Sequence, residues 1–246
     1  MKIIVTDNYE ASCLCAAGII AELVRTKPNA KLGLATGGTP VPIYKKLAED
    51  CAAGTLSFAQ VHTVNLDEYC GLPVTNDQSY RYFMDHNLFD HIDIDKANTY
   101  VASGLGDLAE NCHALDAKVL EDGVTDLQLL GIGNNGHIAF NEAADTLHAD
   151  THIEQLTPVT IAANARFFAT KDDVPTQAIT MGMRSILAAK AVLLVASGEA
   201  KTEAIRGLIM DDVITTHNPS TLLKLHADAT VIIDKALATA VGYKGE

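Results

Sequence analysis

Residues 129–142, with the sequence LLGIGNNGHIAFNE, bring together side chains that can do acid–base chemistry. An apolar run ends there at a Gly-x-Gly turn, and Asn135, His137 and Glu142 follow closely. This pattern predicts a buried strand that stops at a tight turn and presents an imidazole, a carboxylate and carboxamides at its carboxyl end. Ligands of open α/β sheets bind outside the carboxyl ends of the strands, so we expect proton transfer here. A packing role for His137 remains the alternative.

The segment TGGTP at residues 36–40 has the composition of a phosphate cradle. It lies between an expected strand and an expected helix, and Gly37 and Gly38 let the backbone approach a ligand closely. Thr36 and Thr39 add hydroxyls next to the free N–H groups of the helix start. The segment is neither a Walker loop nor a GxGxxG dinucleotide fingerprint. On its own it is equally compatible with an ordinary glycine turn.

Asp67 and Glu68 are adjacent carboxylates at the end of another expected strand. Consecutive residues of an extended chain point in opposite directions, so we expect one acid to serve as a base in the crevice and the other to cap a turn or pair at the surface. Two solvated acids are the alternative. Arg166 and Lys201 are candidate anion-binding cations, although each taken alone is more often a surface residue.

Strand-like apolar runs alternate along the chain with segments of helical period. We expect strands at residues 2–6, 31–35, 61–66, 126–132, 178–180, 191–196 and 230–233, and helices at 8–25, 41–51, 105–121 and 199–210. This alternation predicts an α/β fold with a doubly wound, mostly parallel, Rossmann-like sheet and helices on both faces, in a single domain of residues 1–246. Residues 143–174 interrupt the alternation and are expected to form a lid, with a peripheral helix and connector as the alternative.

Composition and charge exclude several classes of protein. The net charge of −13 with scattered Lys and Arg argues against nucleic-acid binding. No apolar stretch reaches the roughly 18 residues that span a bilayer, and no signal peptide is present, so we expect a cytoplasmic protein. Five cysteines without CxxC spacing indicate reduced thiols. His148 and His152 lack the adjacent Glu of a metalloprotease helix, so no metal is expected.

Five motifs occur in one order along the chain: ATGGTP, NLDEYCGL, GIGNNGHIAFNE, NARFF and ASGEAK. Together they resemble the glucosamine-6-phosphate deaminase (isomerase) family over about residues 2–235. The resemblance implies conversion of D-glucosamine 6-phosphate and water to D-fructose 6-phosphate and ammonia, without a cofactor, in the catabolism of amino sugars such as N-acetylglucosamine. It implies that Asp67 moves the C2 proton and that His137 opens the sugar ring with Glu142 as its carboxylate partner. The TGGT loop, Arg166 and Lys201 match phosphate-binding positions.

Two departures from the family pattern affect this expectation. Some members have Asp where this chain has Asn135, and an amide can neither accept a proton nor stabilise an imidazolium by charge. The relay is therefore expected to rest on Glu142, with a possible shift of the pH optimum. Allosteric members carry basic residues shortly after the catalytic Glu, whereas residues 145–154 contain none. We therefore expect a short, non-allosteric form.

Three other functions remain open at this stage. A 6-phosphogluconolactonase has a similar fold, but that family tends to have Asp-Glu-Arg where residues 67–69 read Asp-Glu-Tyr, and it lacks the Phe-Asn-Glu of residues 140–142. A galactosamine-6-phosphate deaminase differs by one epimeric hydroxyl that leaves no recognisable trace. A sugar-phosphate-sensing binding module would need a DNA-binding segment, which the acidic sequence does not show. The sugar phosphate is the only partner expected, and the protein is expected to be a monomer or a small homo-oligomer.

Overall fold

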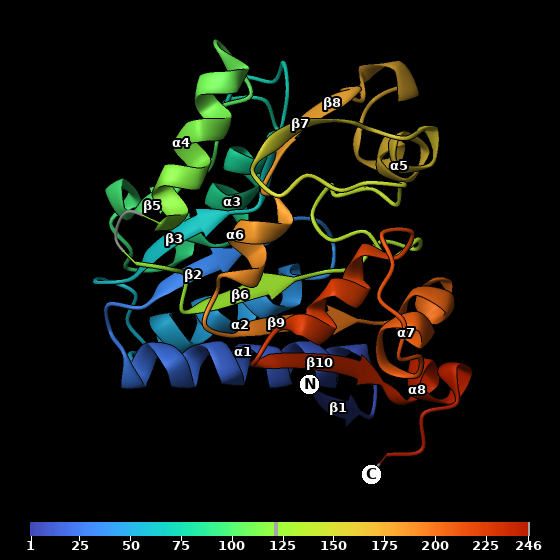
Figure 1. Cartoon of the computed structure of the whole chain (residues 1–246). Coiled ribbons are helices and arrows are strands. Elements are labelled where there is room, and N and C mark those ends of the chain that lie inside the picture. The colour runs from blue at the N-terminus through green and yellow to red at the C-terminus, as the bar shows by residue number, and fades with distance from the viewer. Residues whose placement is uncertain (121–122, 246) are drawn as a thin grey trace.

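Seven parallel strands form the centre of the computed structural model, which describes residues 1–120 and 123–245 (Figure 1). The inner strands at Leu127–Leu130 and Val192–Ala196 are buried along their whole length, as expected for a parallel sheet that is covered by helices. In spatial order they are β1 (Lys2–Thr6), β10 (Ala229–Asp234), β9 (Val192–Ala196), β6 (Leu127–Leu130), β2 (Lys31–Leu34), β3 (His62–Asn65) and β5 (Thr99–Tyr100).

The direction in which the sheet grows reverses between β2 and β6. After β2 the chain adds β3 and β5 on one side, and after β6 it adds β9 and β10 on the other. Such a reversal is a topological switch point, and ligands bind just beyond the carboxyl ends of the two strands that form it. The loops after β2 and β6 carry the TGGTP segment and the Gly-x-Gly turn, and they therefore emerge side by side.

The expected doubly wound, mostly parallel sheet is confirmed, with element ends shifted by a few residues. Asn8 caps α1 (Tyr9–Thr26) by accepting the N–H of Ala11 at 2.9 Å. The helix expected at residues 105–121 is α4 (Leu108–Leu120), and residue 121 lies outside the described residues. The remaining helices include α2 (Val41–Ala52) and α7 (Thr202–Ile209), together with three that the sequence pattern missed, α3 (Tyr80–Asn87), α6 (Met183–Leu187) and α8 (Lys235–Val241).

Residues 178–180, expected among the strands of the main alternation, belong instead to a second sheet. This antiparallel sheet places β8 (Gln177–Thr180) between β4 (Asp67–Tyr69) and β7 (His152–Gln155). β7 comes from the stretch 143–174, which continues into α5 (Pro158–Asn164) and the 3₁₀ turns η3 (Ala165–Phe167) and η4 (Lys171–Asp173). The first part of that stretch is thus hydrogen-bonded into the body of the protein.

A small aromatic cluster joins the second sheet to its surroundings. The ring centroid of Tyr69 lies 4.8 Å from that of Tyr80, 5.7 Å from that of Phe140 and 5.8 Å from that of Phe168. These rings come from β4, α3, the segment after β6 and the segment after η3, so four regions distant in sequence pack on one another. No helix within the described ranges is both long and apolar enough to cross a membrane.

We predict that position 33 in β2 must be a glycine, because the side chain of Gln128 on β6 occupies the space that a larger residue would need. A Cβ on Gly33 would lie 2.0 Å from Oε1 of Gln128. Gly33→Ala should therefore lower the free energy of unfolding by about 1–3 kcal/mol, and adding Gln128→Ala should recover part of that loss. Urea unfolding of the two single variants and the double variant measures this coupling. Strictly additive effects would contradict the steric explanation.

Candidate active site

A cavity of about 940 Å³ opens beyond the switch point of the sheet. It is bordered by the loops after β2, β6 and β9, by the start of β4, and by α5 and η3. All but one of the residues predicted to catalyse the reaction or bind the substrate line it: Thr36, Gly37, Gly38, Thr39, Asp67, Asn135, His137, Arg166 and Lys201. The exception, Glu142, lies directly behind the His137 ring. Residues taken from five separate motifs are thus brought together in one place.

Asp67 is a buried carboxylate without a hydrogen-bond partner. It begins β4, pairs in register with Thr180 of β8, and is only 6% exposed. No other described residue donates a hydrogen bond to its side chain. Burial, together with the charge of the adjacent Glu68, raises the pKa of Asp67 to about 8. A carboxylate with a raised pKa that faces a cavity has the properties of a general base.

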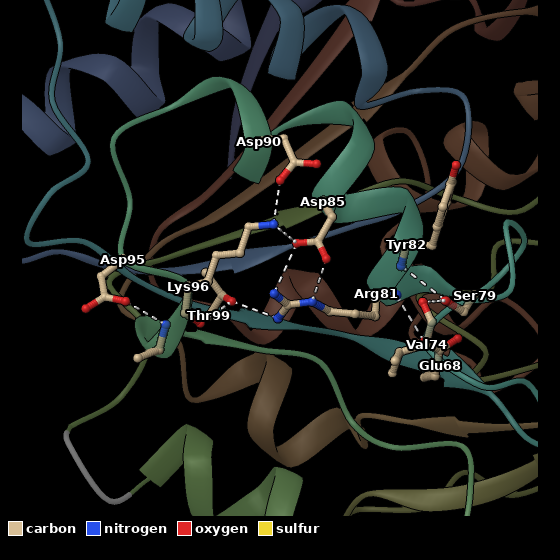
Figure 2. A network of polar contacts seen from close by, with 11 residues as sticks. Glu68, Val74, Ser79, Arg81, Tyr82, Asp85, Asp90, Asp95, Lys96 and Thr99 are labelled. Carbon is tan, nitrogen blue, oxygen red and sulfur yellow. Dashed lines mark hydrogen bonds and ion pairs between the residues drawn. The ribbon is translucent and has the colours of Figure 1, made fainter.

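Glu68 is not among the residues that line the cavity and instead caps α3 (Figure 2). Its carboxylate accepts the backbone N–H groups of Tyr69 and Tyr80 at 2.8 Å and of Arg81 at 3.0 Å. Burial raises the pKa of Glu68 to about 7 against the opposing effect of these donors. Glu68 thus caps a helix, as expected for one of the two acids, and is buried; the role of Asp67 as the base stays a prediction.

The helix that Glu68 caps is fixed by a network of side chains at its other face (Figure 2). The Arg81 guanidinium binds both carboxylate oxygens of Asp85, at 3.0 and 3.1 Å, and donates to Oγ1 of Thr99 at 2.8 Å. Nζ of Lys96 lies 3.3 Å from the same Asp85 carboxylate. Because α3 is held in this way, its first residue, Tyr80, is presented to the cavity.

The loop after β6 presents the imidazole of His137. Gly133 allows this, since a Cβ there would lie 2.3 Å from Cε1 of the ring. Nδ1 of His137 is 3.3 Å from Oε2 of Glu142, an ion-pair distance at which the hydrogen-bond geometry is not met. Asn135 donates to the same oxygen at 3.1 Å and accepts the His137 backbone N–H at 3.2 Å. The side-chain amide of Asn135 thus links the loop that carries His137 to the carboxylate of Glu142.

Glu142 is buried and remains a carboxylate over a wide pH range. Its other oxygen, Oε1, accepts hydrogen bonds from the hydroxyls of Thr160 and, at 3.3 Å, Thr157. Burial raises the pKa of Glu142, but the neighbouring imidazole and the donors from Thr160 and Asn135 outweigh it and lower the pKa to about 2. An ionised partner of this kind can orient a histidine and stabilise its protonated form.

A second group of residues that line the cavity is suited to an anion. Gly37 has a φ of +89°, and the Tyr9 hydroxyl donates to the carbonyl oxygens of Gly38 and Thr39 at 3.2 and 3.1 Å. Arg166 and Lys201 both line the cavity, and burial together with the positive charge of Arg166 lowers the pKa of Lys201. Within the described residues neither of them forms an ion pair with a carboxylate. Two such cations beside a glycine turn can hold a phosphate group.

The sequence analysis missed several residues at this site. Tyr9 and Tyr80 line the cavity, and Thr157 and Thr160 hold Glu142. Nothing in the spacing of the tyrosines distinguishes them from core residues, whereas the Thr-Pro pair at residue 157 is a recognisable helix start. Across residues 1–120 and 123–245, no three metal-binding side chains converge.

These features define a class of protein: an α/β enzyme with an acid–base site for a small anionic substrate. The chain matches the family described as glucosamine-6-phosphate isomerases/6-phosphogluconolactonase over residues 9–232, and it belongs to that family. The resemblance drawn from the five motifs is therefore confirmed.

Relatives of known name extend over the full chain. A glucosamine-6-phosphate deaminase of Clostridium beijerinckii is 50% identical over 242 residues, covering 98% of this chain and 100% of that protein. One of Thermoanaerobacter pseudethanolicus is 48% identical, covering 98% and 95%. The solved structure of a monomeric glucosamine-6-phosphate deaminase of the NagB superfamily gives a TM-score of 0.94 at 42% identity, covering 98% and 100%. A 6-phosphogluconolactonase of Thermotoga maritima gives 0.76 at 18% identity, covering 95% and 99%, and shares the fold.

We predict that Glu68→Gln lowers the pKa of Asp67. The amide keeps an acceptor oxygen for the α3 cap but removes the negative charge that, after burial, disfavours ionisation of Asp67. The Asp67 carboxyl resonance, followed by ¹³C NMR against pH, should move its midpoint down from about 8. Glu22→Gln, on the exposed side of α1, serves as the control. An unchanged midpoint in Glu68→Gln would show that burial alone sets the pKa.

Proposed function

We propose that this protein is an enzyme that converts D-glucosamine 6-phosphate and water to D-fructose 6-phosphate and ammonia. The observation that carries the proposal is one cavity that is lined by the Asp67 carboxylate, by the imidazole of the His137–Glu142 pair, and by a glycine turn with two cations that form no ion pair with any described carboxylate. Full-length relatives that bear this enzyme name support the choice of reaction.

The phosphate of the substrate is held by Arg166, Lys201 and the TGGT loop. Arg166 offers a planar fork of donors, Lys201 a point charge, and the loop its backbone N–H groups. This end of the substrate takes no part in bond making. Its binding energy therefore orients the sugar with respect to the catalytic groups.

His137 opens the sugar ring. The neutral imidazole takes the proton from O1 and returns it to the ring oxygen, which leaves an open-chain 2-amino aldehyde. Glu142, ionised throughout, stabilises the imidazolium that forms between the two transfers. Asn135 contributes no charge here, and its hydrogen bonds keep the carboxylate and the loop aligned.

Asp67 then isomerises the open chain. Its carboxylate removes the C2 proton to give an enolamine, and reprotonation at C1 gives a 2-iminium ketose. Water adds to C2 and ammonia leaves, which balances the overall reaction. The nitrogen of the substrate itself accommodates the charge of the intermediate. Since only the ionised acid acts as a base, turnover should rise with pH towards the pKa of Asp67.

Residues 143–174 act as the lid of this site. β7 is fixed in the second sheet, so the moving part is the following segment with α5 and η3, which borders the cavity and carries Arg166. Residues 145–154 contain no Lys or Arg, which supports a short form without an allosteric sugar-phosphate site. We place the enzyme in the cytoplasm, as a monomer or small homo-oligomer that acts in amino-sugar catabolism.

Incubation of the purified protein with D-glucosamine 6-phosphate tests the proposal directly. We expect ammonia and D-fructose 6-phosphate to form in equal amounts without any added cofactor. D-galactosamine 6-phosphate and 6-phosphogluconolactone are assayed in parallel. Preference for either of these would replace the proposed reaction. Binding of the sugar phosphates without turnover of any would identify a sensor instead.

Asp67→Asn should abolish turnover and stabilise the protein at alkaline pH. Loss of a general base lowers kcat by roughly 10²- to 10⁴-fold. The pKa of Asp67 rises from 3.8 to about 8 on folding, so within this window the folded state keeps a proton that the unfolded state has lost, and stability falls as pH rises. The variant should thus have a higher Tm than wild type near pH 8 and a smaller advantage near pH 4. Wild-type turnover in Asp67→Asn would refute the assignment.

A further inference from the structure

The carboxylate of Glu142 is held from two different segments of the chain. Its Oε2 faces His137 and Asn135 on the loop after β6. Its Oε1 faces Thr157 and Thr160 at the first turn of α5, the helix that follows β7. The Thr157 hydroxyl also lies 3.1 Å from that of Thr160, so the two threonines form one group around this oxygen. Glu142 is therefore a junction between the imidazole and the segment proposed as the lid.

The same short helix also borders the cavity on the way to Arg166. Val159, Thr160 and Asn164 of α5 line the cavity, and Arg166 follows in η3, which begins at the residue directly after the helix. Because helix and 3₁₀ turn are continuous, a movement of Arg166 towards an anion is passed on to α5. The cation that would bind the anion and the threonines that bind the Glu142 carboxylate thus belong to one short, continuous segment of backbone.

The threonine contacts are also the ones that orient α5. Among the described residues, the hydrogen bonds to Glu142 are the only side-chain hydrogen bonds between α5 and another element. The other attachments are apolar: Ile161 packs on the aromatic cluster, to which Phe168 beyond η3 belongs. Apolar contacts are non-directional, whereas a hydrogen bond from a hydroxyl to a carboxylate restricts the donor–acceptor distance and angle. A shift of α5 therefore changes the hydrogen bonds that orient the Glu142 carboxylate.

We propose that Thr160 is a positioning residue that transmits phosphate binding at Arg166 to the Glu142 carboxylate and through it to His137. This inference rests on the proposed function, which supplies the phosphate of the sugar substrate as the anion. Its consequence is that the phosphate does more than anchor the substrate. Binding it sets the orientation of the carboxylate on which the ring-opening histidine depends, so the phosphate contributes to kcat as well as to KM.

The coupling can be measured without any reaction, by NMR of the His137 imidazole with inorganic phosphate as the probe. Addition of phosphate to the wild-type protein should shift the ring resonances, and Arg166→Ala should abolish the shift together with binding. Thr160→Val should bind phosphate with unchanged affinity but lose the shift at His137. Thr160→Ser, which keeps the hydroxyl, should restore it. Thr170→Val is the matched control, because that exposed threonine bonds to Asp173 and not to Glu142.

Steady-state kinetics supply the second readout. Thr160→Val should lower kcat by about 10- to 100-fold, the range expected for losing a hydrogen bond to a charged group, with little change in KM. Thr160→Ser should be close to wild type. A phosphate-dependent shift that persists in Thr160→Val would overturn the coupling, and so would a loss of phosphate affinity as large as that of Arg166→Ala. If the protein does not turn over glucosamine 6-phosphate, the NMR result still decides the coupling, and the proposed function fails separately.

Discussion

The organisation of this protein depends on keeping three carboxylates out of water around one cavity. Asp67, Glu68 and Glu142 are each at most 6% exposed, and a buried charge is costly unless hydrogen bonds or opposite charges compensate it. Glu68 is compensated by the backbone of α3, and Glu142 by hydroxyls, an amide and an imidazole. Asp67 alone receives no hydrogen bond from the described residues. The surroundings therefore lower the pKa of Glu142 to about 2, offset only part of the effect of burial on Glu68, whose pKa is about 7, and leave Asp67, with a pKa of about 8, as the most basic of the three.

The second sheet and the aromatic cluster explain how such a site stays in place on a parallel sheet. β4 continues from the end of β3 and pairs with β8, so Asp67 is held by a ladder rather than by a loose loop. Ala139, with a φ of +53°, carries the chain from His137 to Phe140, whose N–H is bound by Thr180 of β8 at 3.0 Å. Strain of this kind persists only where the surroundings over-determine it. The rings of the cluster and β8 provide those surroundings.

Sequence reasoning was most successful where the pattern itself is local. Continuous apolar runs followed by glycine turns identified the parallel strands and the loops after β2 and β6, and thereby most of the cavity. It failed where the partner is distant. A buried Ala-Ile-Thr run does not show whether it joins a parallel or an antiparallel sheet, so β8 was misplaced. Similarly, the start of α3 depends on hydrogen bonds from its backbone to Glu68, and the role of Thr160 depends on its hydrogen bond to Glu142. The periodicity of the sequence indicates neither contact.

The order of strands also constrains how the chain can be made. β1 lies at an edge of the main sheet and pairs with β10 in parallel register, Lys2 opposite Thr230. During synthesis the first strand of the chain therefore has no neighbour until almost the whole sequence has left the ribosome. The chain must hold an apolar segment unpaired for most of its translation, the period in which nascent proteins aggregate or recruit chaperones. The long α1 follows β1 directly and contacts it, and since it can fold within its own sequence it can shield the strand early.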